Sequence, residues 1–137
     1  MSFEELIIDM CRSERLPLAR VEADFFRIDL IDERDHAQHP VFLHPVKGHG
    51  GILLLEAYTI FFSPADVLSK QQLNFLLHTS TTFSAGEFAI VETPNSSMVI
   101  YRFRIPLHQL DAPAFTRIIA AVATCGNEMK IIFNEVN

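Results

Sequence analysis

The chain has 137 residues, of which 49% are apolar and 20% charged, and its net charge is −6. That composition is too apolar for a disordered chain and is ample for one hydrophobic core, so we predict a single domain over residues 1–137. An acidic surface repels phosphate backbones, which argues against nucleic-acid binding. The apolar runs are too short to cross a bilayer and the first residues lack the composition of a signal peptide. We therefore expect no membrane partner and a cytoplasmic location.

An amphipathic helix is the first predicted element. Ser2 and Glu5 have the spacing of a capping box. Behind this cap, apolar residues recur at the i, i+3, i+4, i+7 spacing of one helical face: Phe3, Leu6, Ile7 and Met10. The helix should end at Leu16, because the residue before Pro17 is disfavoured in helical geometry.

Two strands are predicted next. Residues 20–31 alternate in both phases, with a slip at Phe25–Phe26 that suggests a bulge or a change of buried face. Residues 32–40 are polar and predict a loop. Residues 41–47 contain Pro45, which cannot donate to a sheet ladder, so this strand should lie at an edge or carry a bulge.

A tight turn and a buried strand follow. The glycines of residues 48–51 are typical of a turn, because glycine adopts positive φ at little cost. Residues 52–62 are apolar in both phases. They predict a central strand that is covered on both faces for part of its length.

A second helix is predicted from Ser63 to about residue 78. Ser63, Pro64 and Asp66 fit its first capping positions. Its apolar side chains cover so wide an arc that more than one surface must bury them. In a domain of this size, the second surface is expected to be another copy of the chain. The residues assigned to this dimer interface are Leu73, Leu76 and Leu77.

Residues 86–92 and 98–105 predict a hairpin around the turn at 93–97. In its second strand Val99, Tyr101, Phe103 and Ile105 share one face, and Arg102 and Arg104 share the other. Such alternation indicates a sheet with one wet face. We interpret the two arginines as solvent-exposed residues on that face.

The last predicted element is a helix that Asp111 caps, with Pro113 in its first turn. Its apolar stripe is resumed in phase beyond Gly126, so the helix either continues through this glycine or pauses there. The complete order is α-β-β-β-α-β-β-α. Strands that cluster rather than alternate with helices favour an α+β fold, with an antiparallel sheet packed by helices.

Two stretches resemble a known family. "SPADVLSKQQLNFLLHTSTTFSAGEFAIV" (63–91) and "MVIYRFRIPLHQLDAPAFTRIIAAVAT" (98–124) are similar to the second half of the type III secretion chaperone-like superfamily, which includes YbjN-like proteins and Tir-type secretion chaperones. The family often has an asparagine soon after its Leu-Leu pair, whereas here Leu76 and Leu77 precede His78. The strand at 99–105 and its connector favour the YbjN-like branch. A true secretion chaperone remains the other possibility.

The resemblance implies a bacterial, non-enzymatic protein-binding module, chaperone-like or regulatory. Secretion chaperones form homodimers and present apolar grooves and sheet edges, over which an extended partner segment wraps. Transferred to this chain, the partner-binding residues would come from the first helix and the proposed edge strand: Phe3, Leu6, Ile7, Met10, Val41 and Leu43. The identity of the protein partner is not specified by the sequence.

The alternative interpretation is a small metal- or ligand-binding enzyme. Residues 35–51 contain four of the six histidines: His36, His39, His44 and His49. No cysteine or HExxH-type glutamate follows them, and they fall in a loop, a strand and a turn, so they need not converge. We expect no functional metal and no cofactor, although His36 and His39 could bind a metal adventitiously.

Catalytic motifs are not found in the sequence. It has no GxSxG elbow, no GxGxxG and no P-loop. Cys11 and Cys125 form no CxxC pair and fall on apolar helical stripes, so we expect buried free thiols. No catalytic residue is therefore assigned.

Overall fold

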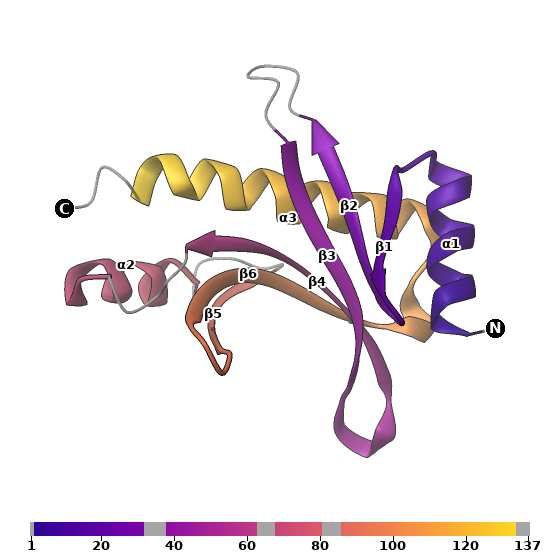
Figure 1. Ribbon diagram of the computed structural model, residues 1–137, viewed down its shortest axis with the longest axis horizontal. Helices are drawn as coiled ribbons and strands as arrows, with labels where there is room; N and C mark the ends of the chain where they lie inside the picture. The colour runs from indigo at the N-terminus through magenta and orange to yellow at the C-terminus, as the bar shows by residue number, and fades with distance from the viewer. Residues whose placement is uncertain (1, 32–37, 63–67, 81–85, 134–137) are drawn as a thin grey trace.

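The computed structural model describes residues 2–31, 38–62, 68–80 and 86–133, with backbone alone at 62, 77, 79–80, 126–127 and 129–133 (Figure 1). Its helices are α1 (Phe3–Glu14), α2 (Lys70–Ser80) and α3 (Ala112–Phe133). Its strands are β1 (Leu18–Glu22), β2 (Phe25–Ile31), β3 (Gln38–Lys47), β4 (Leu53–Phe62), β5 (Glu87–Glu92) and β6 (Ser97–Pro106). Within the described residues the strands form one antiparallel sheet in the order β1-β2-β3-β4-β6-β5. This confirms the predicted α+β class.

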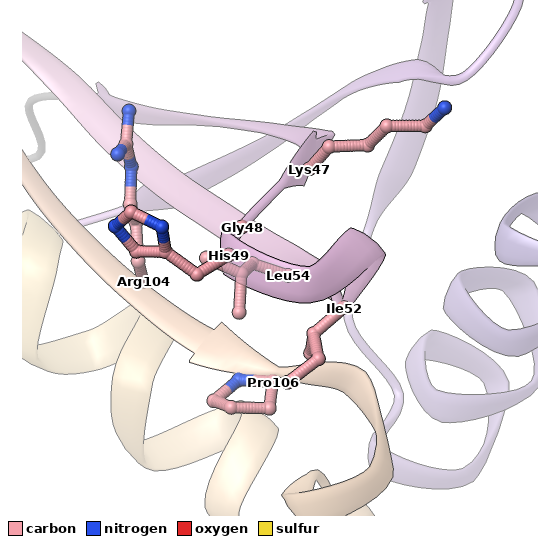
Figure 2. Close-up of a pocket in the computed structure, with 7 residues that line it drawn as sticks. All are labelled: Lys47, Gly48, His49, Ile52, Leu54, Arg104 and Pro106. Atoms are coloured by element: carbon pink, nitrogen blue, oxygen red, sulfur yellow. The ribbon is translucent and has the colours of Figure 1, made fainter.

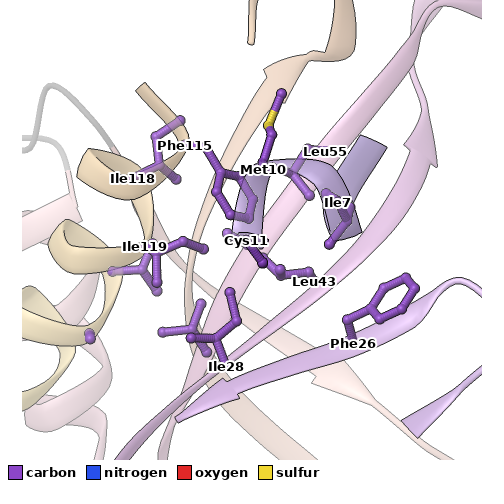
Figure 3. Close-up of a cluster of buried hydrophobic side chains, with 14 of the residues drawn as sticks. Ile7, Met10, Cys11, Phe26, Ile28, Leu43, Leu55, Phe115, Ile118 and Ile119 are labelled. Carbon is purple, nitrogen blue, oxygen red and sulfur yellow. The ribbon is translucent and has the colours of Figure 1, made fainter. Parts of the chain in front are cut away.

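Helices lie against one face of the sheet. Figure 1 shows α3 crossing the strands on one side, with α1 beside β1. The core lies between these helices and the sheet, and Figure 3 shows α1 and α3 side chains meeting those of β2, β3 and β4. Its fully buried members include Ile7, Phe26, Ile28, Val41, Leu43, Leu55, Phe115 and Ile119. At the other end of β4 and β6, α2 packs on a second cluster formed by Phe61, Leu68, Leu76 and Val99.

The first helix begins where the sequence predicts, and it ends at Glu14, two residues before the predicted Leu16. The Ser2 hydroxyl accepts a hydrogen bond from the Glu5 amide at 3.2 Å. At the other end Arg15 adopts a left-handed conformation with φ of 57°, and the Leu16 amide donates to the Cys11 carbonyl at 2.8 Å. Local cap chemistry therefore determines the length of α1.

The single strand predicted over residues 20–31 is wrong. The chain reverses there, so that β1 and β2 form a hairpin in which Glu22 pairs with Phe25. Asp24 takes a φ of 55° in this turn, a conformation that aspartate tolerates better than most residues. The slip at Phe25–Phe26 thus marked a tight turn, and the observed order is α-β-β-β-β-α-β-β-α.

The predicted edge position of residues 41–47 is also wrong. β3 pairs with β2 through Gln38–Leu43 and with β4 through Phe42–Lys47, so it lies inside the sheet. Pro45 falls in the part of β3 that pairs with β4 but not with β2, which leaves room for a residue without an amide hydrogen. Among the described strands, β1 and β5 lie at the edges of the sheet.

The turn and the central position of the strand after it are confirmed. Gly50 and Gly51 have φ values of 69° and 77°, which residues with a side chain rarely adopt. β4 lies between β3 and β6. The sheet is therefore continuous through β4, the strand that the apolar run at 52–62 predicted to be central.

The second helix begins later than predicted. α2 starts at Lys70, and Ser69 forms a reciprocal capping box with Gln72, at 3.1 Å and 2.9 Å. Ser63, Pro64 and Asp66, predicted as its cap, lie outside the described residues. The Ser-x-x-Gln spacing was available in the sequence and gave the better start signal.

The last hairpin and helix agree with the predictions. β5 and β6 pair from Glu87 with Arg102 to Glu92 with Ser97. The Asp111 carboxylate accepts a hydrogen bond from the Ala114 amide at 2.7 Å at the start of α3. The helix then runs unbroken through Gly126, which resolves the choice that the sequence left open.

Gly86, just before β5, has no room for a side chain. A Cβ atom at this position would lie 2.6 Å from the Tyr101 hydroxyl and 2.8 Å from the Arg102 carbonyl oxygen. We expect Gly86→Ala to lower the free energy of unfolding by about 1–3 kcal/mol, because neither the Tyr101 side chain nor the Arg102 backbone can shift without a cost in free energy. Gly48→Ala is the matched control, since its Cβ would come closest to the flexible Leu54 side chain, at 3.2 Å, and would lie at an ordinary contact distance of 3.5 Å from the Ile52 carbonyl oxygen. Urea denaturation showing equal losses for the two variants would contradict this.

Candidate protein-interaction face

One face of the sheet turns away from α1 and α3. Side chains alternate along a strand, so the residues between the core positions of β2, β3, β4 and β6 point to this side. Register places Phe42 opposite Tyr58 and Tyr58 opposite Arg102, and it places His44 opposite Glu56 and Glu56 opposite Arg104. We call this surface the open face and define it by Phe25, Arg27, Phe42, His44, Glu56, Tyr58, Arg102 and Arg104.

Aromatic rings from β2, β3 and β4 lie together on one part of the open face. The Phe25 and Phe42 centroids lie 5.8 Å apart, and Phe42 stacks on Tyr58 at 5.3 Å. His44 meets the edge of Tyr58 at 5.7 Å. All four side chains are only partly buried, so a connected aromatic band from three strands remains accessible. Aromatic side chains of this kind supply much of the binding energy in protein interfaces.

A buried carboxylate lies beside the aromatic band. Glu56 is only 5% exposed although it points to the open face, because polar side chains cover it. Its Oε1 accepts a hydrogen bond from Arg104 Nε at 2.8 Å and lies 3.6 Å from Arg102 Nη1, and its Oε2 contacts His44 Nε2. Arg102 is also held by Glu87, at 3.0 Å through Nε and 2.9 Å through Nη2.

This arrangement corrects the interpretation of Arg102 and Arg104 as simply solvent-exposed. Both guanidiniums converge on one buried acid. The sequence contained one usable signal, since Glu56 is the only charged residue in the apolar run at 52–62. A carboxylate in such a strand needs partners. Which residues lie opposite it follows only from the β4–β6 register.

The ionisation of Glu56 is set by these partners. Burial by itself raises the pKa of its carboxyl, but hydrogen bonds and charge from His44 and Arg104 outweigh burial and lower the pKa from 4.5 to about 2. The neighbouring Tyr58 has a raised pKa, first because of burial and then because of the Glu56 charge. Glu56 is therefore ionised at neutral pH and holds Arg104 in a fixed orientation.

A hollow lies beside this cluster at the turn end of the β3–β4 hairpin. It has a volume of about 510 Å³ and is lined by Lys47, Gly48, His49, Ile52, Leu54, Arg104 and Pro106 (Figure 2). A second hollow of about 250 Å³ is lined by Gly86, Glu87, Arg102, Phe103 and Arg104. Arg104 is common to both hollows.

The predicted partner-binding residues lie mainly in the core. Phe3 and Met10 are each 7% exposed, and Ile7, Val41 and Leu43 are 0% exposed. Leu6 is partly buried and packs against the same cluster. Their partner-binding role stays a prediction, but this chain by itself uses these side chains for packing. The large apolar side chains that are exposed in the described residues are Val21, Ile31, Ile52, Leu53, Ile60 and Ile90.

The predicted dimer residues lie on α2. Leu76 is 4% exposed and packs with Phe61, Leu68 and Val99, and Leu73 is partly buried against the same cluster. The side chain of Leu77 lies outside the described part of the structure. The assignment of these residues to a dimer interface stays a prediction.

The histidines of residues 35–51 are separated where the structure describes them. His39 and His44 occupy opposite faces of β3, because five positions divide them, and His49 lies in the turn beyond. His36 lies outside the described residues. Among the residues described, no three histidine, cysteine, aspartate or glutamate side chains gather closely enough to hold a metal ion.

The cysteines are both free thiols. Cys11 is buried in the core, as predicted, and burial raises its pKa to about 12, so that the thiol stays protonated. Cys125 is half-buried on α3. Over the described part of the chain, no helix is long and apolar enough to span a membrane.

Comparison with known proteins connects the chain to a fold. No family model and no curated protein matches it. Solved structures do match. The HopA1–SchA chaperone–effector complex matches with a TM-score of 0.60 and 15% identity over 93% of this chain and 92% of that chain. The ExsC–ExsE complex matches with a TM-score of 0.60 and 16% identity over 94% and 91%. YbjN from E. coli matches with a TM-score of 0.59 and 8% identity over 98% and 90%. The predicted type III secretion chaperone-like fold is therefore confirmed, and identities this low show the fold alone.

Proposed function

We propose that this chain is a non-enzymatic protein-binding module, chaperone-like or regulatory, which acts in the cytoplasm as a homodimer and binds an extended segment of another polypeptide. Two of the solved structures with this fold are complexes of two different proteins, one of them a chaperone and its effector. The observation that carries the proposal is the aromatic band of Phe25, Phe42 and Tyr58, on a sheet face that the described helices leave uncovered.

Sheet edges supply the second element of such binding. With β3 inside the sheet, strand addition would use β1 or β5. In β1, residues 19–22 are all exposed, and Val21 retains 49% of its surface. Main-chain hydrogen bonds to β1 would hold a partner strand, and the exposed side chains would provide selectivity.

The experiment is purification of tagged protein from cells of its natural source, followed by light scattering of the isolated species. We expect two copies of this chain together with a stoichiometric partner polypeptide. Leu73→Glu should reduce the species to one copy or destabilise the fold, because it places a charge in the apolar surface of α2.

Leu53→Glu is the matched control. Leu53 is 39% exposed on β4, away from α2, so its substitution should leave the oligomeric state unchanged. A folded, dimeric Leu73→Glu variant would exclude α2 as the interface. A wild-type monomer without any bound polypeptide would contradict the proposal as a whole.

A further inference from the structure

Arg104 is a fixed cationic group with unused hydrogen-bond donors. Its Nε donates to the buried Glu56 at 2.8 Å, which fixes the plane of the guanidinium. Its side chain is 39% exposed, and no further polar partner for its terminal nitrogens is found among the described residues. A guanidinium held in this way can receive a carboxylate with little loss of side-chain entropy.

Apolar surface surrounds the space beside Arg104. Figure 2 shows His49 and Arg104 together at one side of the larger hollow, with Ile52 and Pro106 at the other, while the Lys47 side chain points away. Ile52 keeps 48% of its surface exposed, so this apolar wall is accessible. A ligand for this site would need one anionic group and an adjacent apolar group.

Charge complementarity decides the kind of occupant. The chain carries a net charge of −6, yet the lining of this hollow includes Lys47, His49 and Arg104 and no acidic residue. The Glu56 charge below it is already engaged by two arginines and His44. An acidic segment is therefore attracted to this point of an otherwise acidic protein.

We propose that this hollow selects the partner, by binding an aspartate or glutamate side chain of the partner's extended segment on Arg104, with a flanking apolar side chain against Ile52, Leu54 and Pro106. The inference rests on the proposed function and adds the chemistry of the partner. Arginine and carboxylate form charge-assisted, often bidentate hydrogen bonds, and the apolar wall rejects segments that are acidic but uniformly polar.

The test is selection of a random twelve-residue phage-displayed peptide library on the immobilised wild-type protein. We expect selected peptides to share an aspartate or glutamate beside a large apolar residue. Arg104→Gln should weaken binding of such a synthetic peptide about tenfold or more, because the variant loses a charge-assisted hydrogen bond to the peptide carboxylate. Changing the acidic residue of the peptide to its amide should lower the affinity for the wild-type protein by a similar factor. The same change should have little effect on the affinity for the Arg104→Gln variant, because the interacting partner is already absent.

Arg27→Gln is the matched control. Arg27 also lies on the open face, its side chain is 41% exposed, and its Nε contacts Asp29 at 2.8 Å, but it does not line either hollow. Its substitution should change peptide affinity less than about twofold. Ile52→Ser, which leaves the Glu56 contacts intact, should weaken binding about threefold, whereas Ile31→Ser should not.

The outcomes separate this inference from the proposed function. Selected peptides without an acidic residue, or with affinities insensitive to Arg104→Gln, would overturn the inference and leave protein binding in place. If Arg104→Gln instead converted a dimer to a monomer, the occupant would be a second copy, and the choice of a partner segment would be wrong. Failure to select any peptide would count against both.

Discussion

Replacing Glu56 by glutamine is expected to lower the free energy of unfolding by about 3 kcal/mol at pH 7. The carboxyl pKa falls from 4.5 to about 2 on folding, and each unit of such a shift corresponds to about 1.4 kcal/mol. The amide removes the buried charge that His44 and Arg104 enclose, and it leaves the donors of these two side chains poorly matched. Chemical denaturation of both proteins at pH 7 measures the difference.

The pH dependence of this difference has a defined sign. Because folding lowers the pKa of Glu56, its stabilisation is complete above about pH 4.5 and is lost as the pH falls through about 2. The difference in the free energy of unfolding between wild type and Glu56→Gln should therefore decrease as the pH falls from about 4.5 to about 2. A gap that stayed constant down to pH 2 would show that the substitution acts through packing instead of charge.

Glu87→Gln is the matched control for Glu56→Gln. Glu87 also binds Arg102 on the open face, but its side chain is 55% exposed. Solvent screening makes such a pair worth less than about 1 kcal/mol. Equal losses for the two glutamine variants would mean that the position of Glu56 beneath His44 and Arg104 has no special effect on stability.

Replacing Ile7 by alanine is expected to lower the free energy of unfolding by about 3 kcal/mol. Ile7 is 0% exposed and lies between α1, α3 and the sheet (Figure 3), so truncation removes buried surface and leaves a cavity. Urea denaturation at equal protein concentrations measures the loss, because the proposed dimer would make stability depend on concentration.

This substitution also distinguishes the two roles considered for the α1 stripe. Ile31→Ala is the control, since Ile31 is 63% exposed and its truncation should cost less than about 0.5 kcal/mol. If Ile7→Ala kept wild-type stability but lost a bound partner, the stripe would be a binding surface, as the family resemblance implied. A large loss of stability instead assigns Ile7 to the core.

The predictions from sequence succeeded where the signal is local. The capping residues Ser2 and Asp111, the glycine turn at 48–51 and the alternation of 98–105 each act within a few residues of chain, and each was found in its predicted place. The fold resemblance also succeeded, although the predicted order lacked one strand, since the order of the other elements restricts how their apolar faces can pack.

The failures concern contacts that alternation or composition alone cannot resolve. The slip in residues 20–31 fits a bulge and a reversal equally well, and only the pairing of β1 with β2 decides between them. Pro45 excludes one ladder hydrogen bond at its own position, but it does not indicate whether the first half of β3 is paired with another strand. An apolar helical stripe has the same spacing whether a core or a partner covers it.

By itself, the sequence determined the α+β class, most of the helices and strands, and the absence of a recognisable catalytic motif, because periodicity and capping act along the chain. The tertiary structure decided that β3 lies inside the sheet, that Phe3, Ile7 and Met10 of α1 are buried within this chain, and that Arg102, Arg104 and His44 meet at Glu56. The physical reason is register: side chains 48 positions apart, such as Glu56 and Arg104, become neighbours only when β4 and β6 pair.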